Sequence, residues 1–218
     1  MTGPSRPLTV ADGADVVRWL RRQVPVGASL TVDSRQVLPG DGFIAYPGSR
    51  SDGRDFIANA LDRGARAVLF DSGDHFESPL LPGAMLGVAD LRGLAGPIAA
   101  GFYEEPSRQL ELIAVTGTNG KTSCSQWLAE GFDAAGRRAA VIGTLGSGRV
   151  GHLDAFGLTT PDPVALQRML ARFVRDDVKV VAMEASSIGL DQGRLNGTEV
   201  AAAVFTNLSH DHLDYHGS

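Results

Sequence analysis

The stretch Gly117-Thr118-Asn119-Gly120-Lys121-Thr122 combines two glycines, a lysine and a hydroxyl residue directly after an apolar run. Glycines let a backbone curl closely around phosphate oxygens, and the first N–H groups of a following helix carry a partial positive charge. The lysine can pair with outer phosphates, and the Thr122 hydroxyl can bind Mg²⁺. These residues predict a phosphate-binding loop, although Val115 stands where the common spacing has its first glycine. A plain strand-to-helix turn is the alternative.

Two further polar groups follow apolar runs. Glu184 ends the run VKVVAME, and ligands bind at the carboxyl ends of strands in open α/β sheets. Beside a phosphate loop, this carboxylate is a candidate Mg²⁺ ligand; a capped surface carboxylate is the alternative. The cluster HDHLDYH at 210–216 holds three histidines and two aspartates. It suggests a metal or phosphate site, with a solvated polar loop as the alternative.

The elements that must position these residues alternate between strands and helices. We expect strands at 110–117, 138–143, 178–184 and 199–208, and helices at 122–136 and 163–177. The strands are nearly continuous apolar runs, which is typical of strands buried on both faces. Strand–helix–strand alternation predicts a parallel sheet with right-handed crossovers.

The N-terminal half is less regular. Helices are expected at 12–24 and 52–64, strands at 30–33, 42–46 and 66–70, a loop at 71–84, and a helix near Asp90 that contains Pro97. The polar stretch 104–109, with Pro106, marks a domain boundary. The sequence thus predicts an α/β fold: a small N-terminal α/β domain, 1–108, followed by a P-loop-type central domain with a mostly parallel sheet, 109–218.

Composition narrows the class of protein. The 218 residues suffice for one large domain or two modest ones, and 43% hydrophobic and 21% charged residues are ordinary for a soluble globular protein. A net charge of −5 argues against a nucleic-acid binder. The single cysteine, Cys124, cannot form an intrachain disulfide, which fits a reducing cytosol. No run approaches the roughly 20 apolar residues of a membrane helix.

The loop sequence TGTNGKTS resembles that of the Mur ligases, which are ATP-dependent, amide-forming enzymes. The similarity spans nearly the whole chain and is greatest to the member that adds the third peptide residue to UDP-N-acetylmuramoyl-L-alanyl-D-glutamate. The other matching segments are LTTPDP (158–163), MEASSIGLDQGR (183–194), FTNLSHDHLDYHG (205–217), VDSRQVLPGDGFIAYPG (32–48) and SDGRDFIANALDRGARAV (51–68).

The resemblance implies ATP and Mg²⁺ as cofactors and assigns roles to particular residues. The nucleotide would bind to Gly117, Thr118, Asn119, Gly120, Lys121, Thr122 and Ser123. Catalysis would involve Lys121, Glu184 and His212, and the metal would contact Thr122, Glu184 and His212. The uridine end of the substrate would contact Val32, Ser34, Ser49, Arg50 and Ser51, and the rest of it Thr159, Thr160, Ser186, Gln192 and Arg194. From the residues alone, Asp162 reads as a helix N-cap and Asp33 with Arg35 as a structural pair.

The implied reaction has two steps in the cytoplasm: ATP phosphorylates the D-glutamate carboxylate, and the amine of a diamino acid then attacks the acyl phosphate. Lysine and meso-diaminopimelate both remain open as that amine. The family pattern continues beyond Ser218, so we expect an incomplete central domain, no amino-acid site in this chain and no turnover by it alone. Two alternatives are the sibling ligase that adds the terminal dipeptide and a P-loop nucleotide-binding module without ligase chemistry.

Overall fold

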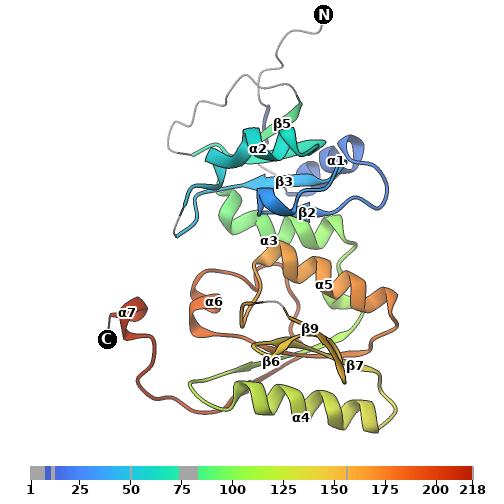
Figure 1. Ribbon diagram of the computed structural model, residues 1–218, viewed down its shortest axis with the longest axis vertical. Coiled ribbons are helices and arrows are strands. Elements are labelled where there is room, and N and C mark those ends of the chain that lie inside the picture. Colours follow the sequence, from blue (N-terminus) through green and yellow to red (C-terminus); the bar gives the residue numbers. More distant parts are fainter. Residues whose placement is uncertain (1–7, 11–12, 50, 74–82, 156, 218) are drawn as a thin grey trace, which may run out of the picture. The chain divides into compact units, whose positions relative to one another are not determined.

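The computed structural model describes residues 8–10, 13–49, 51–73, 83–155 and 157–217. The chain divides into two compact units, Met1–Phe102 and Tyr103–Ser218, and each is described here by itself. Both units are α/β and their sheets are mostly parallel, which confirms the predicted fold class (Figure 1).

The N-terminal unit is built on a five-stranded sheet in which every pair of neighbours is parallel. Its strands, in the order β1-β5-β4-β3-β2, are β1 (Leu8–Val10), β5 (Ala84–Val88), β4 (Ala67–Asp71), β3 (Gly42–Ala45) and β2 (Leu30–Thr31). Its helices are α1 (Gly13–Gln23), α2 (Ile57–Asp62) and α3 (Leu91–Phe102), with short 3₁₀ turns η1 (Ser34–Gln36) and η2 (Gly53–Phe56). The core between sheet and helices includes Phe43, Phe70 and Ile57.

One expectation for this unit needs correction, and the helix expected near Asp90, with Pro97 inside it, is confirmed. The stretch 71–84 was expected to be a loop, but the chain enters strand β5 at Ala84, and 74–82 lie outside the described residues. Helix α3 runs through Pro97 without ending there. Tertiary packing outweighs the local penalty of proline, because the apolar face of α3, including Leu91, Ala95 and Ile98, is buried.

The second unit carries a six-stranded sheet in the order β11-β6-β10-β7-β8-β9. Four strands are parallel: β11 (Ala202–Phe205), β6 (Glu111–Thr116), β10 (Val180–Glu184) and β7 (Ala139–Gly143). The other two, β8 (Gly146–Arg149) and β9 (His152–Asp154), extend the sheet antiparallel and were not predicted. The helical elements are η3 (Pro106–Arg108), α4 (Lys121–Ala134), α5 (Pro163–Arg175), α6 (Ser187–Asp191) and α7 (Leu213–His216).

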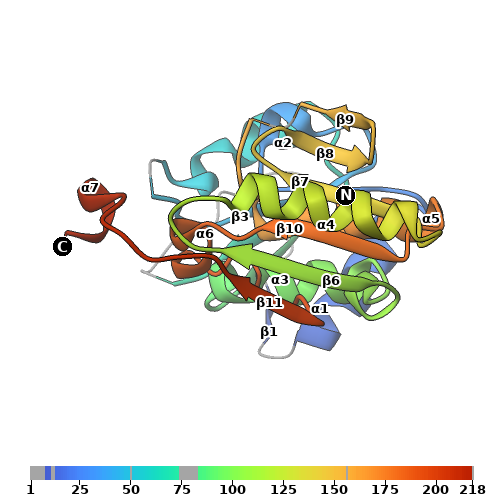
Figure 2. The same cartoon turned by 90° about the horizontal axis from the view of Figure 1, so that it is seen from below.

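Helix α4 covers one face of this sheet and α5 the other, and Figure 2 shows α4 in front of the sheet, running along β6 and β10. Alternate residues of each strand therefore enter two cores: Leu112 and Ile142 pack with Leu166 of α5, whereas Ile113 and Val141 pack with Ala129 of α4. This explains the continuous apolar runs of β6, β7 and β10. The predicted burial on both faces is wrong for β11, which lies at the sheet edge and is mostly exposed.

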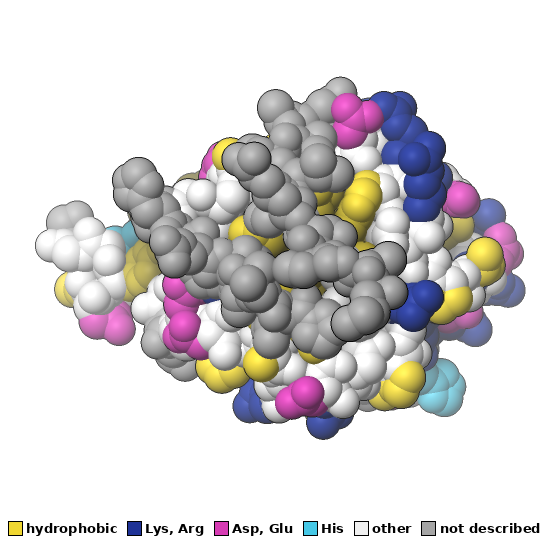
Figure 3. Space-filling view, turned by 90° about the horizontal axis from the view of Figure 1, so that it is seen from above, with side chains coloured by type: hydrophobic (Ala, Val, Ile, Leu, Met, Phe, Trp, Pro, Cys, Tyr) yellow, Lys and Arg dark blue, Asp and Glu magenta, His cyan; other side chains and the backbone are white. Residues whose placement is uncertain are grey.

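Acidic and basic side chains both occur on the face shown in Figure 3, with Lys and Arg gathered along one side. Despite the net charge of −5, the face shown in Figure 3 is therefore not uniformly acidic. Within the described ranges, no helix is long and apolar enough to cross a membrane.

Candidate functional site

The predicted phosphate loop connects strand β6 to helix α4, which begins at Lys121. Gly117 and Gly120 have φ angles of +124° and +87°, a backbone region that favours glycine. A Cβ at Gly117 would collide with Thr206 Oγ1 and lie 2.8 Å from the carbonyl oxygen of Asn207. The glycine is thus required by both conformation and space, and the start of α4 supplies the N–H groups that suit a phosphate.

The segment after β11 holds this loop through reciprocal hydrogen bonds. The Asn207 side chain accepts from the Asn119 N–H at 3.0 Å and donates to the Asn119 carbonyl at 3.0 Å. Thr206 Oγ1 donates to the same carbonyl at 2.7 Å. Thr118 Oγ1 donates to the Ser209 carbonyl at 3.1 Å and accepts from the Ser209 N–H at 2.9 Å. The segment after β11 therefore holds the loop in place.

The Lys121 ammonium group bends back over the loop. Its Nζ donates to the carbonyl oxygens of Gly117 at 2.7 Å and Thr118 at 3.0 Å. The positive charge is thereby held above the loop, within the region where outer phosphates would be bound.

Glu184 lies at the carboxyl end of β10, as expected, and is 1% exposed. Its Oε2 accepts from Thr122 Oγ1 at 3.0 Å and from Thr144 Oγ1 at 3.2 Å, and its Oε1 accepts from the Thr144 N–H at 2.8 Å. A Cβ at Gly143 would collide with Glu184 Oε1. The carboxylate is therefore buried, accepts three hydrogen bonds and is in direct contact with Thr122 of the phosphate loop.

The two threonines before α5, Thr159 and Thr160, differ in burial. Thr160 is 0% exposed, and its hydroxyl donates to the Glu184 carbonyl at 3.0 Å and accepts from the Ser186 N–H at 3.0 Å. Thr159 is half-buried and bonds Thr144 through the two hydroxyls at 3.0 Å. Asp162 caps α5 by accepting from the N–H groups of Val164 and Ala165, which confirms its reading as an N-cap, and burial raises its pKa.

Arg194, expected to contact substrate, is engaged within the protein. Its guanidinium donates to the Thr160 carbonyl at 2.6 Å and to Gln192 Oε1 at 2.7 and 3.1 Å. Ser186 caps α6 by accepting from the Gly189 N–H. In this structure, Ser186, Gln192 and Arg194 thus hold the loop around the threonine pair.

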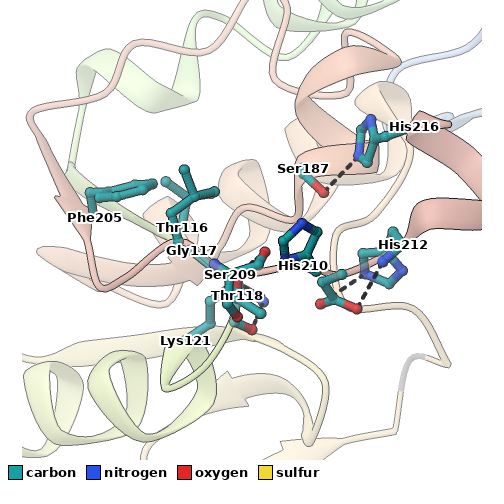
Figure 4. Close-up of a pocket in the computed structure, with 12 residues that line it drawn as sticks. Thr116, Gly117, Thr118, Lys121, Ser187, Phe205, Ser209, His210, His212 and His216 are labelled. Atoms are coloured by element: carbon teal, nitrogen blue, oxygen red, sulfur yellow. Dashed lines mark hydrogen bonds and ion pairs between the residues drawn. The ribbon is translucent and has the colours of Figure 1, made fainter. Parts of the chain in front are cut away.

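A cavity of about 780 Å³ opens beside the phosphate loop. Figure 4 shows Lys121, His210 and His212 around it, with His216 bonded to Ser187. Its lining residues are Thr116, Gly117, Thr118, Lys121, Ser187, Phe205, Leu208, Ser209, His210, Asp211, His212 and His216. Lys121 and His212 therefore share one cavity, whereas Glu184 and Thr122 meet each other at the edge of the loop.

The donors at the loop fit a hard divalent cation. Glu184 offers a carboxylate and Thr122 a hydroxyl, and these oxygens meet at 3.0 Å. Among the residues that the structure describes, no group of three or more His, Cys, Asp or Glu is arranged to hold a metal. Such a pair suits Mg²⁺, which keeps several waters and takes phosphate oxygens besides one or two carboxylates.

The N-terminal unit has a second cavity, of about 710 Å³, which Val32, Ser34 and Ser51 help to line with Tyr46 and Phe56. Ser49 is exposed and is not among the lining residues found in the described part of this unit, and Arg50 lies outside the described residues.

Asp33 and Arg35 form the expected structural pair at the rim of that second cavity. The Arg35 guanidinium donates to both Asp33 carboxylate oxygens at 2.9 Å, and Asp33 also caps η1. This hydrogen bonding holds the pKa of Asp33 below its usual value.

The sequence analysis did not predict Thr144, which hydrogen-bonds to Glu184, or Asn207, which hydrogen-bonds to the phosphate loop. Both follow the carboxyl end of a parallel strand, Thr144 after β7 and Asn207 soon after β11. The rule that selected Glu184 could therefore have selected them as well.

Two family models match the chain. The Mur ligase family catalytic domain matches residues 28–103, and the Mur ligase middle domain matches residues 115–218. Together they include both cavities and the phosphate loop.

Curated relatives share this similarity along most of the chain. The UDP-N-acetylmuramoyl-L-alanyl-D-glutamate–2,6-diaminopimelate ligase of Chromobacterium violaceum is 54% identical over 187 residues, covering 85% of this chain and 38% of that protein. The ligase of the same name from Pseudomonas aeruginosa is 51% identical over 189 residues, covering 87% and 39%. The chain thus spans about 40% of the length of the curated relatives it matches.

Solved structures agree with the fold. A UDP-N-acetylmuramoyl-L-alanyl-D-glutamate–2,6-diaminopimelate ligase matches with a TM-score of 0.71 and 32% identity, over 97% of this chain and 42% of that one. The MurF ligase of Thermotoga maritima in complex with ADP matches with a TM-score of 0.57 and 21% identity, over 88% and 40%. The two family models, the curated relatives and the fold all lead to one conclusion: this chain belongs to the Mur ligase family.

Proposed function

We propose that this protein functions in an ATP-dependent ligase reaction of peptidoglycan precursor synthesis. The reaction adds 2,6-diaminopimelate to UDP-N-acetylmuramoyl-L-alanyl-D-glutamate. The observation that carries the proposal is the β6–α4 phosphate loop hydrogen-bonded to the buried carboxylate of Glu184. The names of relatives 46–54% identical to this chain favour diaminopimelate over lysine as the amine, which the sequence had left open.

In this proposal, ATP lies with its phosphates on the loop of 117–122. The N–H groups at the start of α4 would bind the phosphate oxygens. Lys121 Nζ would exchange the Gly117 and Thr118 carbonyls for outer phosphate oxygens. Glu184 and Thr122 would hold Mg²⁺, which when bound neutralises charge on the phosphates. The cavity of about 780 Å³ is large enough for the rest of a nucleotide.

The chemistry follows from bringing two anions together. A D-glutamate carboxylate oxygen attacks the γ-phosphorus, the bond from that phosphorus to the bridging oxygen breaks, and ADP leaves. The amine nitrogen then attacks the acyl carbon and loses a proton, the carbon–oxygen bond to phosphate breaks, and an amide remains. The Lys121 charge and the α4 N-terminus would stabilise charge on the phosphoryl group during transfer. His212 lines the same cavity and would contact a second Mg²⁺.

Each unit holds its own candidate contacts for the nucleotide-sugar substrate. Val32, Ser34 and Ser51 line the N-terminal cavity and would contact the uridine end. Thr159 is the member of the threonine pair that is not fully buried, so it would contact the peptide end. We place the reaction in the cytoplasm, where ATP is available, and assign no residue of this chain to the diamino acid.

Calorimetric titration of the 218-residue chain with ATP and Mg²⁺, and separately with UDP-N-acetylmuramoyl-L-alanyl-D-glutamate, tests the proposal. We expect saturable binding of both ligands. Tight GTP binding together with no saturable binding of the nucleotide-sugar would overturn the proposal and favour a nucleotide-binding module without ligase chemistry.

A further inference from the structure

Thr144 connects the candidate metal ligand to the candidate substrate loop. It is the first residue after β7, and both its N–H and its hydroxyl reach the Glu184 carboxylate, at 2.8 and 3.2 Å. The same hydroxyl lies 3.0 Å from Thr159 Oγ1. One side chain therefore contacts two groups that the proposed reaction requires.

The direction of these hydrogen bonds follows from the number of protons. The Thr144 hydroxyl donates to Glu184 Oε2, and a hydroxyl has only one proton to give. Thr144 then has only lone pairs to offer to Thr159, so Thr159 must donate to Thr144. The chain of bonds runs in a single direction, from Thr159 through Thr144 to Glu184.

The space around the carboxylate leaves it little freedom. A Cβ on Gly143 would collide with Glu184 Oε1 and lie 2.8 Å from its Cδ, so the carboxylate packs directly against the end of β7. The neighbouring Thr160 hydroxyl is already committed to the Glu184 carbonyl and to Ser186. Because Thr160 is also 0% exposed, Thr159 is the member of the threonine pair whose hydroxyl oxygen a ligand could reach.

We infer that Thr144 is a positioning residue with two effects. It holds the Glu184 carboxylate toward Thr122, and it makes Thr159 a hydrogen-bond acceptor that selects an N–H or O–H donor on the substrate, such as a peptide amide. This inference rests on the proposed function, because it assigns roles to Thr144 within the same site.

Thr144→Val removes the hydroxyl at nearly constant volume, whereas Thr144→Ser keeps both donors. The probes are ATP titrated at increasing Mg²⁺ and UDP-N-acetylmuramoyl-L-alanyl-D-glutamate. We expect the valine variant to need about tenfold more Mg²⁺ for half-maximal ATP binding and to bind the nucleotide-sugar several-fold more weakly, on the scale of one charge-assisted hydrogen bond. The serine variant should stay within about twofold of the original chain.

A double variant separates positioning from general damage. If Thr144 acts through Thr159, adding Thr144→Val to Thr159→Val should weaken nucleotide-sugar binding no further, while the Mg²⁺ requirement still rises. Thermal unfolding checks each variant, and Thr144→Ala replaces the valine variant if that one is unfolded. Equal Mg²⁺ and nucleotide-sugar titrations for valine and serine variants would overturn the inference and leave the proposed function intact. Absence of binding by the original chain would overturn the proposed function and the inference with it.

Discussion

The Asn207 side chain acts as a clamp on the phosphate loop, and Asn207→Ala is the change that tests this role. It removes the acceptor of the Asn119 N–H and a donor to the Asn119 carbonyl, both at 3.0 Å. The carbonyl keeps its bond from Thr206 Oγ1 at 2.7 Å, so the loop loses one of its attachments rather than all of them.

The size of the effect can be worked from these two bonds. A neutral hydrogen bond contributes about 0.5–1.5 kcal/mol net, and because Asn207 is exposed, water can replace part of each. The two bonds together are therefore worth about 1–2 kcal/mol. If this energy selects the loop conformation that binds phosphate, its loss lowers nucleotide affinity by up to about 5- to 30-fold.

The assay compares ATP with inorganic tripolyphosphate by calorimetry in the presence of Mg²⁺. A loosened phosphate loop should weaken both ligands by the same factor, because both use the loop through their phosphates. Glu130→Ala is the matched control, since Glu130 is exposed on α4, more than two turns beyond Lys121. That variant should bind both ligands as the original chain does.

Two results would refute the reasoning. If Asn207→Ala binds both ligands unchanged while hydrogen exchange at the Asn119 amide accelerates, the clamp exists but does not select the binding conformation. If ATP weakens and tripolyphosphate does not, Asn207 acts on another part of the nucleotide.

Two other substitutions each remove one charged side chain, Lys121 in the second unit and Asp52 in the N-terminal unit. Lys121→Met removes the ammonium group that is held above the loop, and it should weaken ATP in the calorimetric titration by about 10- to 100-fold, the value of a charged hydrogen bond, with an unchanged unfolding temperature as the control. Asp52→Asn keeps the N-cap on Arg54 but removes the ion pair with the Arg54 guanidinium, whose hydrogen bond lowers the pKa of Asp52. Because that pKa is depressed on folding, the stabilisation is present above pH 3.8 and is lost as the pH falls through the folded value. Denaturant unfolding at pH 7 should therefore show a loss on the order of 1 kcal/mol that shrinks as the pH is lowered below 3.8, and a pH-independent loss would contradict this cause.

The sequence was most informative where one local signal sufficed. Apolar runs buried on both faces identified β6, β7 and β10, and glycines with a lysine at the end of such a run identified the turn between β6 and α4. The antiparallel extension β8–β9 was missed because both strands are short and β8 contains Gly146 and Gly148, a residue type that is rare in strands.

Residue type alone could not identify Thr144 and Asn207. Threonine and asparagine are common in loops, and their roles here depend on which strands are neighbours, which is a property of the tertiary structure. Thr160 was predicted as a substrate contact from its residue type and motif. In the structure, its hydroxyl donates to the Glu184 carbonyl and accepts from the Ser186 N–H.

The strand order explains how four separate segments meet at one place. In the order β11-β6-β10-β7, the loop after β6 lies between the ends of β11 and β10, and the end of β10 lies between that loop and the end of β7. Asn207 can therefore reach Asn119, Thr122 can reach Glu184, and Thr144 can reach Glu184. Exchanging the places of β10 and β11 would keep every motif in the sequence but would separate Glu184 from Thr144. The arrangement of the site is thus a consequence of sheet topology, and the motifs supply only its parts.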